Sequence, residues 1–305
     1  MDEYSIAGRD LRKITSQGEY IAYENTKKED VVERLKGAEI AITNKVVIDG
    51  EAMRQLPDLK LICVAATGMN NVDLNAAAEL GIVVKNAVGY STSSVAETTL
   101  ASALALARNI VYFDGYFHDG RYSKADRAFC YDRHTFELRG KRWGIIGLGN
   151  IGREVARLAT AFGCEVRYFS TSGTKREEAY PAMELTELLE WSNIVSVHSP
   201  LNERTRDLVG REELRTMKPS AIIINVARGG IINEAALAEA LNEGWISAAA
   251  LDVFSVEPLR ESPLYNIKDR YRLLASPHNA WSAAEAIDRL ITCVAENIRT
   301  WKEEE

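Results

Sequence analysis

Three polar side chains of the 305-residue sequence, Arg228, Glu257 and His278, have types that together support acid–base chemistry on an anionic ligand. An imidazolium is the side chain best matched to protonating a developing alkoxide near neutral pH, so His278 is the candidate proton donor. A carboxylate beside it, which Glu257 can supply, would fix the ring and favour its charged form. A guanidinium such as that of Arg228 binds a carboxylate through two hydrogen bonds.

Each of these residues follows a short apolar run that predicts a β-strand, over residues 221–225, 248–253 and 273–275 respectively. Open α/β sheets bind ligands outside the carboxyl ends of their strands, so the three side chains are expected at one edge of a sheet. Each has a plain structural alternative, namely a surface ion pair for Arg228, a loop charge for Glu257 and a helix cap for His278. Because each of the three residues follows a strand of the same predicted sheet, a catalytic set is favoured.

A glycine pattern, Gly147-Leu148-Gly149-Asn150-Ile151-Gly152, follows the apolar run over residues 142–146 and precedes a helical pattern. In a strand–turn–helix the first glycine permits a tight turn, the second lets the backbone approach a pyrophosphate, and the third allows close packing. The helix N-terminus then offers unpaired N–H groups to phosphates. Although the glycines alone are explained equally well by turn geometry, in this context they predict a dinucleotide site.

The fingerprint usually carries an acidic residue about 20 positions further on, which binds the adenosine ribose, and here that position is Ser170. A serine bonds a ribose hydroxyl but does not repel the 2′-phosphate of NADP as a carboxylate would. Lys175 and Arg176 are near enough in the sequence to attract that phosphate, and they are equally well explained as the start of a solvated helix. We therefore predict NAD as the cofactor and leave NADP open.

The composition argues against several other classes of function. The formal net charge is −7 and the basic residues are scattered, so neither nucleic acid nor an anionic membrane is an expected partner. No apolar run approaches the roughly 20 residues of a membrane span, and the first residues carry no signal-peptide pattern, which predicts a cytoplasmic protein. The cysteines form no Cys-x-x-Cys pair, so no metal site is expected and they are interpreted as small buried hydrophobic residues.

Short apolar runs alternate with helix-period segments along most of the chain, which predicts an α/β fold with parallel sheets. A first series has strands over residues 38–43, 61–65 and 82–85, with helices over 28–36 and 72–80. A second series has six strand candidates, which suit a doubly wound sheet and cover residues 142–146, 165–169, 194–198, 221–225, 248–253 and 273–275.

The two series predict two doubly wound domains. One long helix over residues 94–113 is expected to connect them, and an amphipathic helix over 283–301 is expected to return to the first. We therefore predict that a dinucleotide-binding domain over residues 97–282 is inserted into a substrate domain formed by 1–96 and 283–305. Because no Gly/Ser-rich linker is visible, the domains are expected to touch and to move as hinged bodies.

These motifs together resemble the D-isomer-specific 2-hydroxyacid dehydrogenase family over nearly the whole chain. The segments that carry the resemblance are residues 67–73, 94–97, 147–152, 225–230, 252–258 and 277–278. The resemblance implies a Rossmann domain inserted in a flavodoxin-like domain, a nicotinamide cofactor, a small 2-oxo or D-2-hydroxy acid as substrate, and a homodimer joined through its cofactor domains.

The resemblance also implies roles for individual residues. Arg228 would bind substrate, Glu257 would orient His278, and His278 would act as the general acid and base. The backbone around Gly68 and Met69 would receive the substrate carboxylate.

For the cofactor, Asn150 and Ile151 would meet the pyrophosphate, and Asp252 would hold the carboxamide of the nicotinamide. His198, which ends a predicted strand, is expected to border this site. The full set of predicted cofactor contacts is Gly147, Gly149, Asn150, Ile151, Gly152, Ser170, Ser199, Pro200, Val226, Ala227, Arg228, Asp252, His278 and Trp281.

Within the family, residues 168–173 and Trp281 look most similar to glycerate dehydrogenase, also called hydroxypyruvate reductase. This similarity predicts reduction of hydroxypyruvate or glyoxylate to D-glycerate or glycolate. A short phosphoglycerate dehydrogenase is one alternative. A nicotinamide-sensing corepressor with the same fold is another, because such proteins can keep all three candidate catalytic residues.

Members of the family usually open with a buried strand, and Asp2-Glu3-Tyr4-Ser5 resembles the loop that follows it. We therefore expect the natural protein to begin before Met1. Without that strand the first sheet would lack a central member, and backbone groups of its neighbour would be unpaired.

Overall fold

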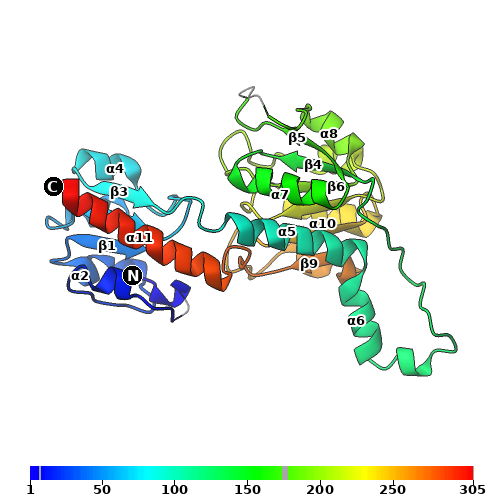
Figure 1. Cartoon of the computed structure of the whole chain (residues 1–305), viewed down its shortest axis with the longest axis horizontal. Helices are drawn as coiled ribbons and strands as arrows, with labels where there is room; N and C mark the ends of the chain where they lie inside the picture. The colour runs from blue at the N-terminus through cyan, green and yellow to red at the C-terminus, as the bar shows by residue number, and fades with distance from the viewer. Residues whose placement is uncertain (7, 174–177, 305) are drawn as a thin grey trace. The chain divides into compact units, whose positions relative to one another are not determined.

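The computed structural model describes residues 1–6, 8–173 and 178–304. The chain divides into two compact units, a smaller one formed by Met1–Ser91 with Ser282–Glu305 and a larger one formed by Thr92–Trp281 (Figure 1). The units change after residues 91 and 281, whereas the boundaries predicted from the sequence lie after residues 96 and 282. Each unit is built on a parallel sheet with helices packed against it, and the predicted α/β fold class is confirmed.

The larger unit contains a six-stranded parallel sheet in the order β5-β4-β6-β7-β8-β9. Its strands are β4 (Arg142–Ile146), β5 (Glu165–Phe169), β6 (Ile194–Val197), β7 (Ile222–Asn225), β8 (Ala248–Leu251) and β9 (Leu273–Ala275). All six predicted strands are therefore present. The strand order changes direction between β4 and β6, and doubly wound sheets bind ligands in the crevice at such a point.

Helices cover both faces of this sheet. On one face, α5 (Thr92–Ala107) and α7 (Asn150–Ala161) pack around the fully buried Trp143. On the other face lie α8 (Leu185–Trp191), α9 (Arg211–Thr216) and α10 (Glu234–Glu243). Because both faces are covered, β6, β7 and β8 are buried throughout, which explains why their sequences are largely apolar. Ser94 is near the first residue of this unit in the sequence and Ala280 is near the last. Ser94 Oγ donates a hydrogen bond to the Ala280 carbonyl at 2.6 Å.

The single long helix predicted over residues 94–113 is wrong, because the structure has α5 and a separate α6 (Ile110–His118). The break falls at Asn109, which has a left-handed backbone with φ 51°. Asparagine tolerates this conformation better than most residues, but a right-handed helix does not continue through it. The Asn109 Nδ2 donates to the His134 carbonyl at 2.9 Å, which holds the break in place. Helix α6 and the segment after it project from the larger unit (Figure 1).

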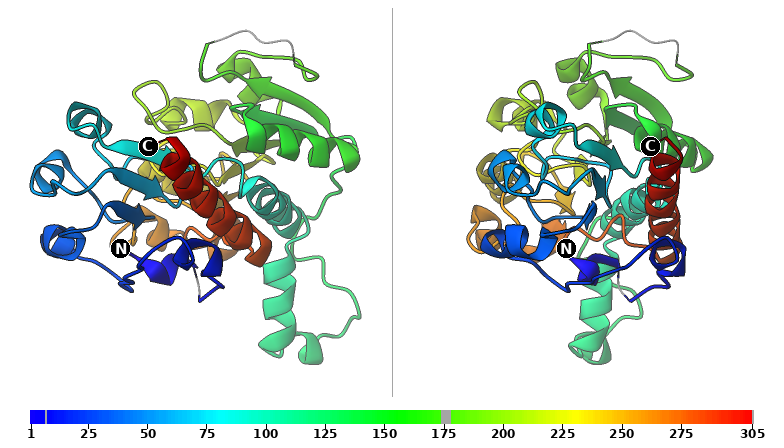
Figure 2. Two further views of the ribbon diagram at one scale, coloured as in Figure 1. Left: turned by 60° about the vertical axis from the view of Figure 1, so that its left-hand side comes forward. Right: turned by 90° about the vertical axis from the view of Figure 1, so that its left-hand side faces the viewer.

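The smaller unit contains a three-stranded parallel sheet in the order β1-β2-β3, formed by Ile40–Thr43, Leu61–Val64 and Val83–Asn86. Helices α2 (Val31–Leu35), α3 (Gly50–Arg54) and α4 (Leu74–Glu79) contribute to its apolar cluster. Helix α11 (Ala284–Glu304) packs against β2, β3 and the short α1 (Arg12–Thr15), as Figure 2 shows. The last predicted helix therefore does return to the first unit.

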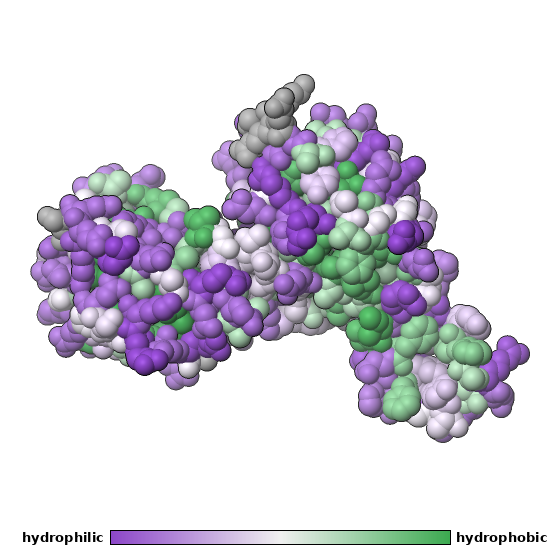
Figure 3. Space-filling view, viewed as in Figure 1, coloured by the Kyte–Doolittle hydropathy of each residue, from purple (hydrophilic) through white to green (hydrophobic). Residues whose placement is uncertain are grey.

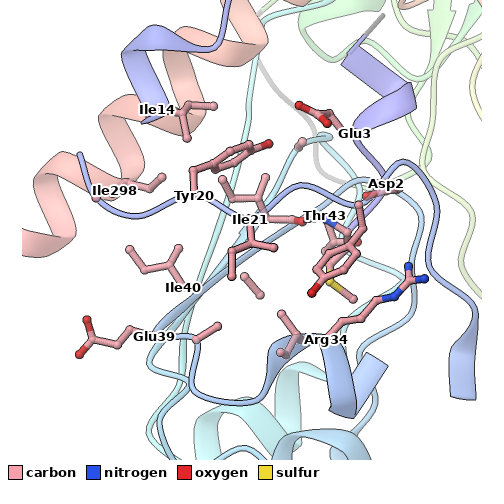
Figure 4. Close-up of a pocket in the computed structure, with 18 of the residues that line it drawn as sticks. Asp2, Glu3, Ile14, Tyr20, Ile21, Arg34, Glu39, Ile40, Thr43 and Ile298 are labelled. Carbon is pink, nitrogen blue, oxygen red and sulfur yellow. Dashed lines mark hydrogen bonds between the residues drawn. The ribbon is translucent and has the colours of Figure 1, made fainter. Parts of the chain in front are cut away.

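A groove of about 420 Å³ lies along β1, the edge strand of the smaller sheet (Figure 4). Its walls include the side chains of Tyr20, Ile21 and Ile298. The ammonium group of Met1 donates to the Ile42 carbonyl at 3.0 Å. Burial lowers the pKa of this ammonium group. The first residues of the chain thus run beside the carboxyl end of β1.

Across the described ranges 1–6, 8–173 and 178–304, no helix combines the length and apolar character that a membrane span requires. The same residues include no group of three or more His, Cys, Asp or Glu side chains placed to hold a metal ion. Cys63 and Cys164 are buried free thiols. Burial raises the pKa of the Cys63 thiol to about 12 and that of the Cys164 thiol to about 11.

Candidate active site

The structure brings His278 and Glu257 together at the carboxyl edge of the larger sheet. Nδ1 of His278 lies 2.7 Å from Oε2 of Glu257. The second carboxylate oxygen, Oε1, accepts a hydrogen bond from the backbone N–H of Phe254 at 3.0 Å, so the carboxylate is held from both sides. The ionised carboxylate accepts the Nδ1 hydrogen, which leaves Nε2 as the nitrogen that can exchange a proton with a ligand.

Asp252 fixes the loop that carries His278. This aspartate is 2% exposed, and its Oδ1 accepts hydrogen bonds from Ser276 Oγ at 2.6 Å and from Asn279 N–H at 2.8 Å. Its Oδ2 accepts from Ala280 N–H at 2.9 Å. These bonds hold His278 at φ 57°, a left-handed conformation that residues other than glycine seldom adopt. Asp252 therefore positions His278, a role that its sequence context did not indicate, and its contact with the carboxamide stays a prediction.

Arg228 follows β7 in a loop that packs against the loop carrying Glu257. Gly229 permits this approach, because a Cβ at that position would lie 1.9 Å from the carbonyl carbon of Phe254. Nη1 of Arg228 donates to the Ala227 carbonyl at 2.7 Å, which sets the direction of the guanidinium. A guanidinium has five N–H donors, so this bond still leaves donors that can hold a carboxylate.

The three glycines of the fingerprint each have a distinct physical reason to be glycine. Gly147 has φ 91°, and its Cα lies against Ser199. A Cβ at Gly149 would meet nothing within 4 Å, so its backbone is open to a ligand. A Cβ at Gly152 would lie 2.3 Å from the Gly147 carbonyl oxygen, so this position requires glycine for close packing. Helix α7 begins directly after Gly149 with no side-chain cap, which leaves its first N–H groups for an anion.

Two buried polar atoms beside this loop fit a bound dinucleotide. Among the residues that the structure describes, His198 Nδ1 and Ser199 Oγ are buried and have no hydrogen-bond partner. Buried polar groups in folded proteins are nearly always paired, so such atoms beside a glycine loop indicate a ligand. Together with the open backbone of Gly149 and the N-terminus of α7, they are suited to the pyrophosphate and ribose groups of NAD(P).

Ser170 lies directly after β5, at the place predicted for the adenosine ribose, with its Oγ 3.3 Å from Ser172 Oγ. Lys175 and Arg176, the cations considered from the sequence, lie outside the described residues. The structure brings Arg204 to this loop, where its Nη1 donates to the Ser172 carbonyl at 3.3 Å. Sequence reasoning missed Arg204, since it belongs to the loop after β6 and no local pattern marks it.

Gly68 and Met69 belong to the smaller unit, in the loop that follows β2. Thr67 Oγ1 donates to the Ala87 carbonyl at 3.0 Å, and Asn86 Nδ2 donates to the Thr67 carbonyl at 2.6 Å. The loop is thus tied to the end of β3. Its predicted contact with the substrate carboxylate stays a prediction.

The remaining predicted cofactor contacts also follow strands of the larger sheet or open α7. Trp281 packs in part against the apolar cluster formed with α5 and α7. The other members of this set are Asn150, Ile151, Pro200, Val226 and Ala227. The sheet topology therefore puts them at the same carboxyl edge as His278, where open α/β sheets bind ligands.

Comparison with known proteins identifies the family of the chain. The family model "D-isomer specific 2-hydroxyacid dehydrogenase, NAD binding domain" matches residues 100–280. A putative 2-hydroxyacid dehydrogenase of Haemophilus influenzae is 41% identical over 282 residues, which cover 90% of this chain and 88% of the relative. A glycerate dehydrogenase of Methylorubrum extorquens is 38% identical, with coverage of 95% and 91%.

A solved structure has a fold similar to that of this chain. An acyclic imino acid reductase, Bsp5, in complex with NADPH and D-Arg has a TM-score of 0.86 and 28% identity to this chain. The likeness covers 96% of this chain and 92% of the reductase. The family match spans more than half of the chain, and the curated relatives match nearly all of it. The chain therefore belongs to the D-isomer-specific 2-hydroxyacid dehydrogenases, enzymes that bind NAD(P) and oxidise or reduce 2-hydroxy and 2-oxo acids.

Proposed function

We propose that this enzyme reduces hydroxypyruvate or glyoxylate to D-glycerate or glycolate, with Arg228, Glu257 and His278 as its catalytic machinery. The hydrogen-bonded pair of His278 and Glu257 is the observation that carries the proposal. Reduction at C2 turns the carbonyl oxygen into an alkoxide, which must gain a proton. A histidine held by a carboxylate at Nδ1 is suited to supply that proton from Nε2.

The nicotinamide, when bound, supplies the hydride. The chain itself supplies charge and a proton: the Arg228 guanidinium holds the substrate carboxylate or carbonyl, and His278 Nε2 gives its proton to the oxygen. Glu257 stabilises the positive ring through Nδ1 and does not need to touch the substrate. In the reverse direction His278 accepts the proton from the hydroxyl group.

A substrate panel tests this proposal. We expect the highest kcat/KM with hydroxypyruvate or glyoxylate, in comparison with phenylpyruvate and 3-phosphohydroxypyruvate. A clear preference for 3-phosphohydroxypyruvate would identify a short phosphoglycerate dehydrogenase instead. Tight NADH binding without turnover of any 2-oxo acid would favour the corepressor-like alternative.

For the cofactor, we propose that NADH is used and that discrimination against NADPH is weak. Ser170 bonds a ribose hydroxyl without the charge that would repel a 2′-phosphate. Arg204, which donates to the neighbouring Ser172 carbonyl, adds a positive charge to the same loop. Both features reduce the electrostatic penalty that an aspartate at position 170 would impose on NADPH.

We assign dinucleotide binding to residues 97–282 and recognition of the substrate carboxylate to the backbone near Gly68 and Met69. The first assignment is supported by the family match to residues 100–280 and by the open start of α7. The second is supported by the fixed loop after β2.

We propose that the enzyme is a homodimer that forms through α6 and the segment after it. This projecting region carries apolar side chains on its surface (Figure 3). Two of them, Phe129 and Tyr131, are 75% and 86% exposed. Ile110, Val111 and Phe117 on α6 are exposed as well. Exposed apolar side chains that gather in this way mark a protein interface, and a second copy of the chain would bury them.

A further inference from the structure

A chain of hydrogen bonds joins Trp143, Ser196 and His198 beneath the glycine loop. Nε1 of Trp143 donates to Ser196 Oγ at 2.9 Å. The same hydroxyl oxygen lies 2.9 Å from Nε2 of His198. Trp143 and Ser196 are fully buried, so water does not compete for these bonds. The catalytic pair and the fingerprint glycines do not account for this arrangement.

The direction of the bonds follows from the chemistry of tryptophan. An indole N–H only donates, so Ser196 Oγ must accept from Trp143. Within the described residues, the serine hydroxyl hydrogen finds an acceptor in Nε2 of His198, which is then unprotonated. The opposite arrangement, with a hydrogen on Nε2, would leave the hydroxyl hydrogen of a fully buried serine without an acceptor. His198 is thus fixed as the tautomer with its hydrogen on Nδ1.

The Nδ1–H group of His198 is a buried donor with no partner among the described residues. Burial lowers the pKa of His198 to about 3, so the ring is neutral near neutral pH. A buried donor without an acceptor destabilises the folded protein, which makes a ligand oxygen the expected partner.

The backbone of His198 lies at the dinucleotide crevice. His198 directly follows β6, and its backbone N–H donates to the Ile146 carbonyl, the last residue of β4, at 2.8 Å. A Cβ at Gly147 would lie 3.1 Å from the carbonyl carbon of His198 and 3.0 Å from the backbone nitrogen of Ser199. The first fingerprint glycine therefore packs directly on the His198–Ser199 segment, at the point where the strand order changes direction.

We propose that His198, fixed as the Nδ1–H tautomer by Ser196 and Trp143, donates a hydrogen bond to an oxygen of the bound dinucleotide's phosphate–ribose backbone. The proposal rests on dinucleotide binding at the glycine loop. Ser196 and Trp143 are positioning residues, because they act on the ligand only through the tautomer of His198. The bond needs no charge on the ring, in contrast to the role assigned to His278.

Two isosteric substitutions test the donor atom. Asparagine places its amide N–H₂ near the position of Nδ1, whereas glutamine places its amide near Nε2. We expect His198→Asn to keep the Kd for NADH within about threefold of the wild-type value and His198→Gln to raise it about tenfold. Ser196→Ala should raise the Kd by a smaller factor, because Nε2 then loses the partner that selects the tautomer. Binding is measured without substrate, by the fluorescence of NADH.

The tautomer itself can be measured by NMR in the free protein. The ¹⁵N chemical shifts of His198 should show hydrogen on Nδ1 and none on Nε2, and Ser196→Ala should mix the two forms. ADP-ribose, which has the same phosphate–ribose backbone without nicotinamide, should reproduce the difference between the Asn and Gln variants. Thermal unfolding of the free variants separates a loss of the donor from a loss of stability.

Equal NADH binding by the Asn and Gln variants, or hydrogen on Nε2 in the free wild-type protein, would overturn this inference. Failure of the wild-type protein to bind NADH or ADP-ribose would overturn the dinucleotide site as well. The first pair of results leaves the proposed reduction of 2-oxo acids intact, so the two failures are distinguishable.

Discussion

The Cα of Gly229 packs against the carbonyl group of Phe254, so that a Cβ on Gly229 would lie 1.9 Å from the Phe254 carbonyl carbon. The loop that carries Arg228 and the loop that carries Glu257 are therefore in direct contact. Gly229→Ala must push them apart, and we expect kcat/KM to fall roughly 10²-fold, the effect of misplacing reacting groups by about 1 Å. Gly210→Ala, where a Cβ meets its nearest atom at 3.3 Å, is the matched control. Unchanged kcat/KM in a folded Gly229→Ala protein would show that the spacing of the loops does not matter.

His278→Gln removes the proposed general acid. We expect kcat for reduction to fall by roughly 10²–10⁴-fold, while the Kd for NADH stays nearly constant. Steady-state kinetics and fluorescence titration measure the two quantities. His118→Gln serves as the control, because His118 is an exposed residue of α6. Near-normal turnover of His278→Gln would remove His278 from the mechanism.

Glu257→Gln keeps the shape of the side chain but removes the charge beside Nδ1 of His278. A neutral partner stabilises the imidazolium less, so the ring loses its proton at lower pH. Because reduction uses the protonated ring, the fall of kcat with rising pH should move toward lower pH. An unchanged pH profile would assign Glu257 a purely structural role.

Ser170→Asp places a carboxylate at the expected position of the adenosine ribose. We expect kcat/KM to fall more for NADPH than for NADH, since like charge opposes the 2′-phosphate. Arg204→Gln should act in the same direction by removing the positive charge beside Ser172. The measurement is the ratio of kcat/KM values for the two cofactors. If neither substitution changes the ratio, the ribose does not lie at this loop.

Phe129→Asp places a charge on the projecting segment that follows α6. We expect the sedimentation coefficient to change from that of a dimer to that of a monomer, because the interface would have to bury the carboxylate. Val88→Asp alters an apolar residue of the smaller unit that is 60% exposed, and it should have no such effect. A dimer that survives Phe129→Asp at low protein concentration would place the interface elsewhere.

Much of the larger unit was predictable because its chemistry is local in the sequence. Strands such as β7 and β8 are short apolar segments, and the glycines before α7 stand where the backbone conformation or close packing requires glycine. The residues after β7, β8 and β9 could be grouped because parallel strands end at one edge. To predict residues of this kind, it is enough to recognise a strand from its residue pattern and the turn that follows it.

Other features depend on contacts between distant segments and leave no local pattern. Asn109 breaks a continuous helical pattern through its own backbone conformation and a bond to His134. Arg204 reaches the Ser170 loop only in the folded chain. Asp252 fixes the His278 loop by accepting hydrogen bonds from backbone N–H groups, and these bonds can be recognised only once the positions of the N–H groups are known. The Nδ1–H tautomer of His198 likewise depends on Trp143, which bonds Ser196 although it lies 53 residues earlier in the sequence.

The bond between Ser94 and Ala280 joins the first helix of the larger unit to its last loop, so this unit has all of its parts before α11 has been synthesised. The smaller unit starts first on the ribosome and yet finishes last, since α11 supplies the helix that packs against β2 and β3. Until α11 emerges, the larger unit is complete in the nascent chain while the smaller unit still lacks a helix. An apolar face of the smaller sheet then stays uncovered until α11 has been synthesised, and apolar surface exposed in this way makes a nascent chain prone to aggregation.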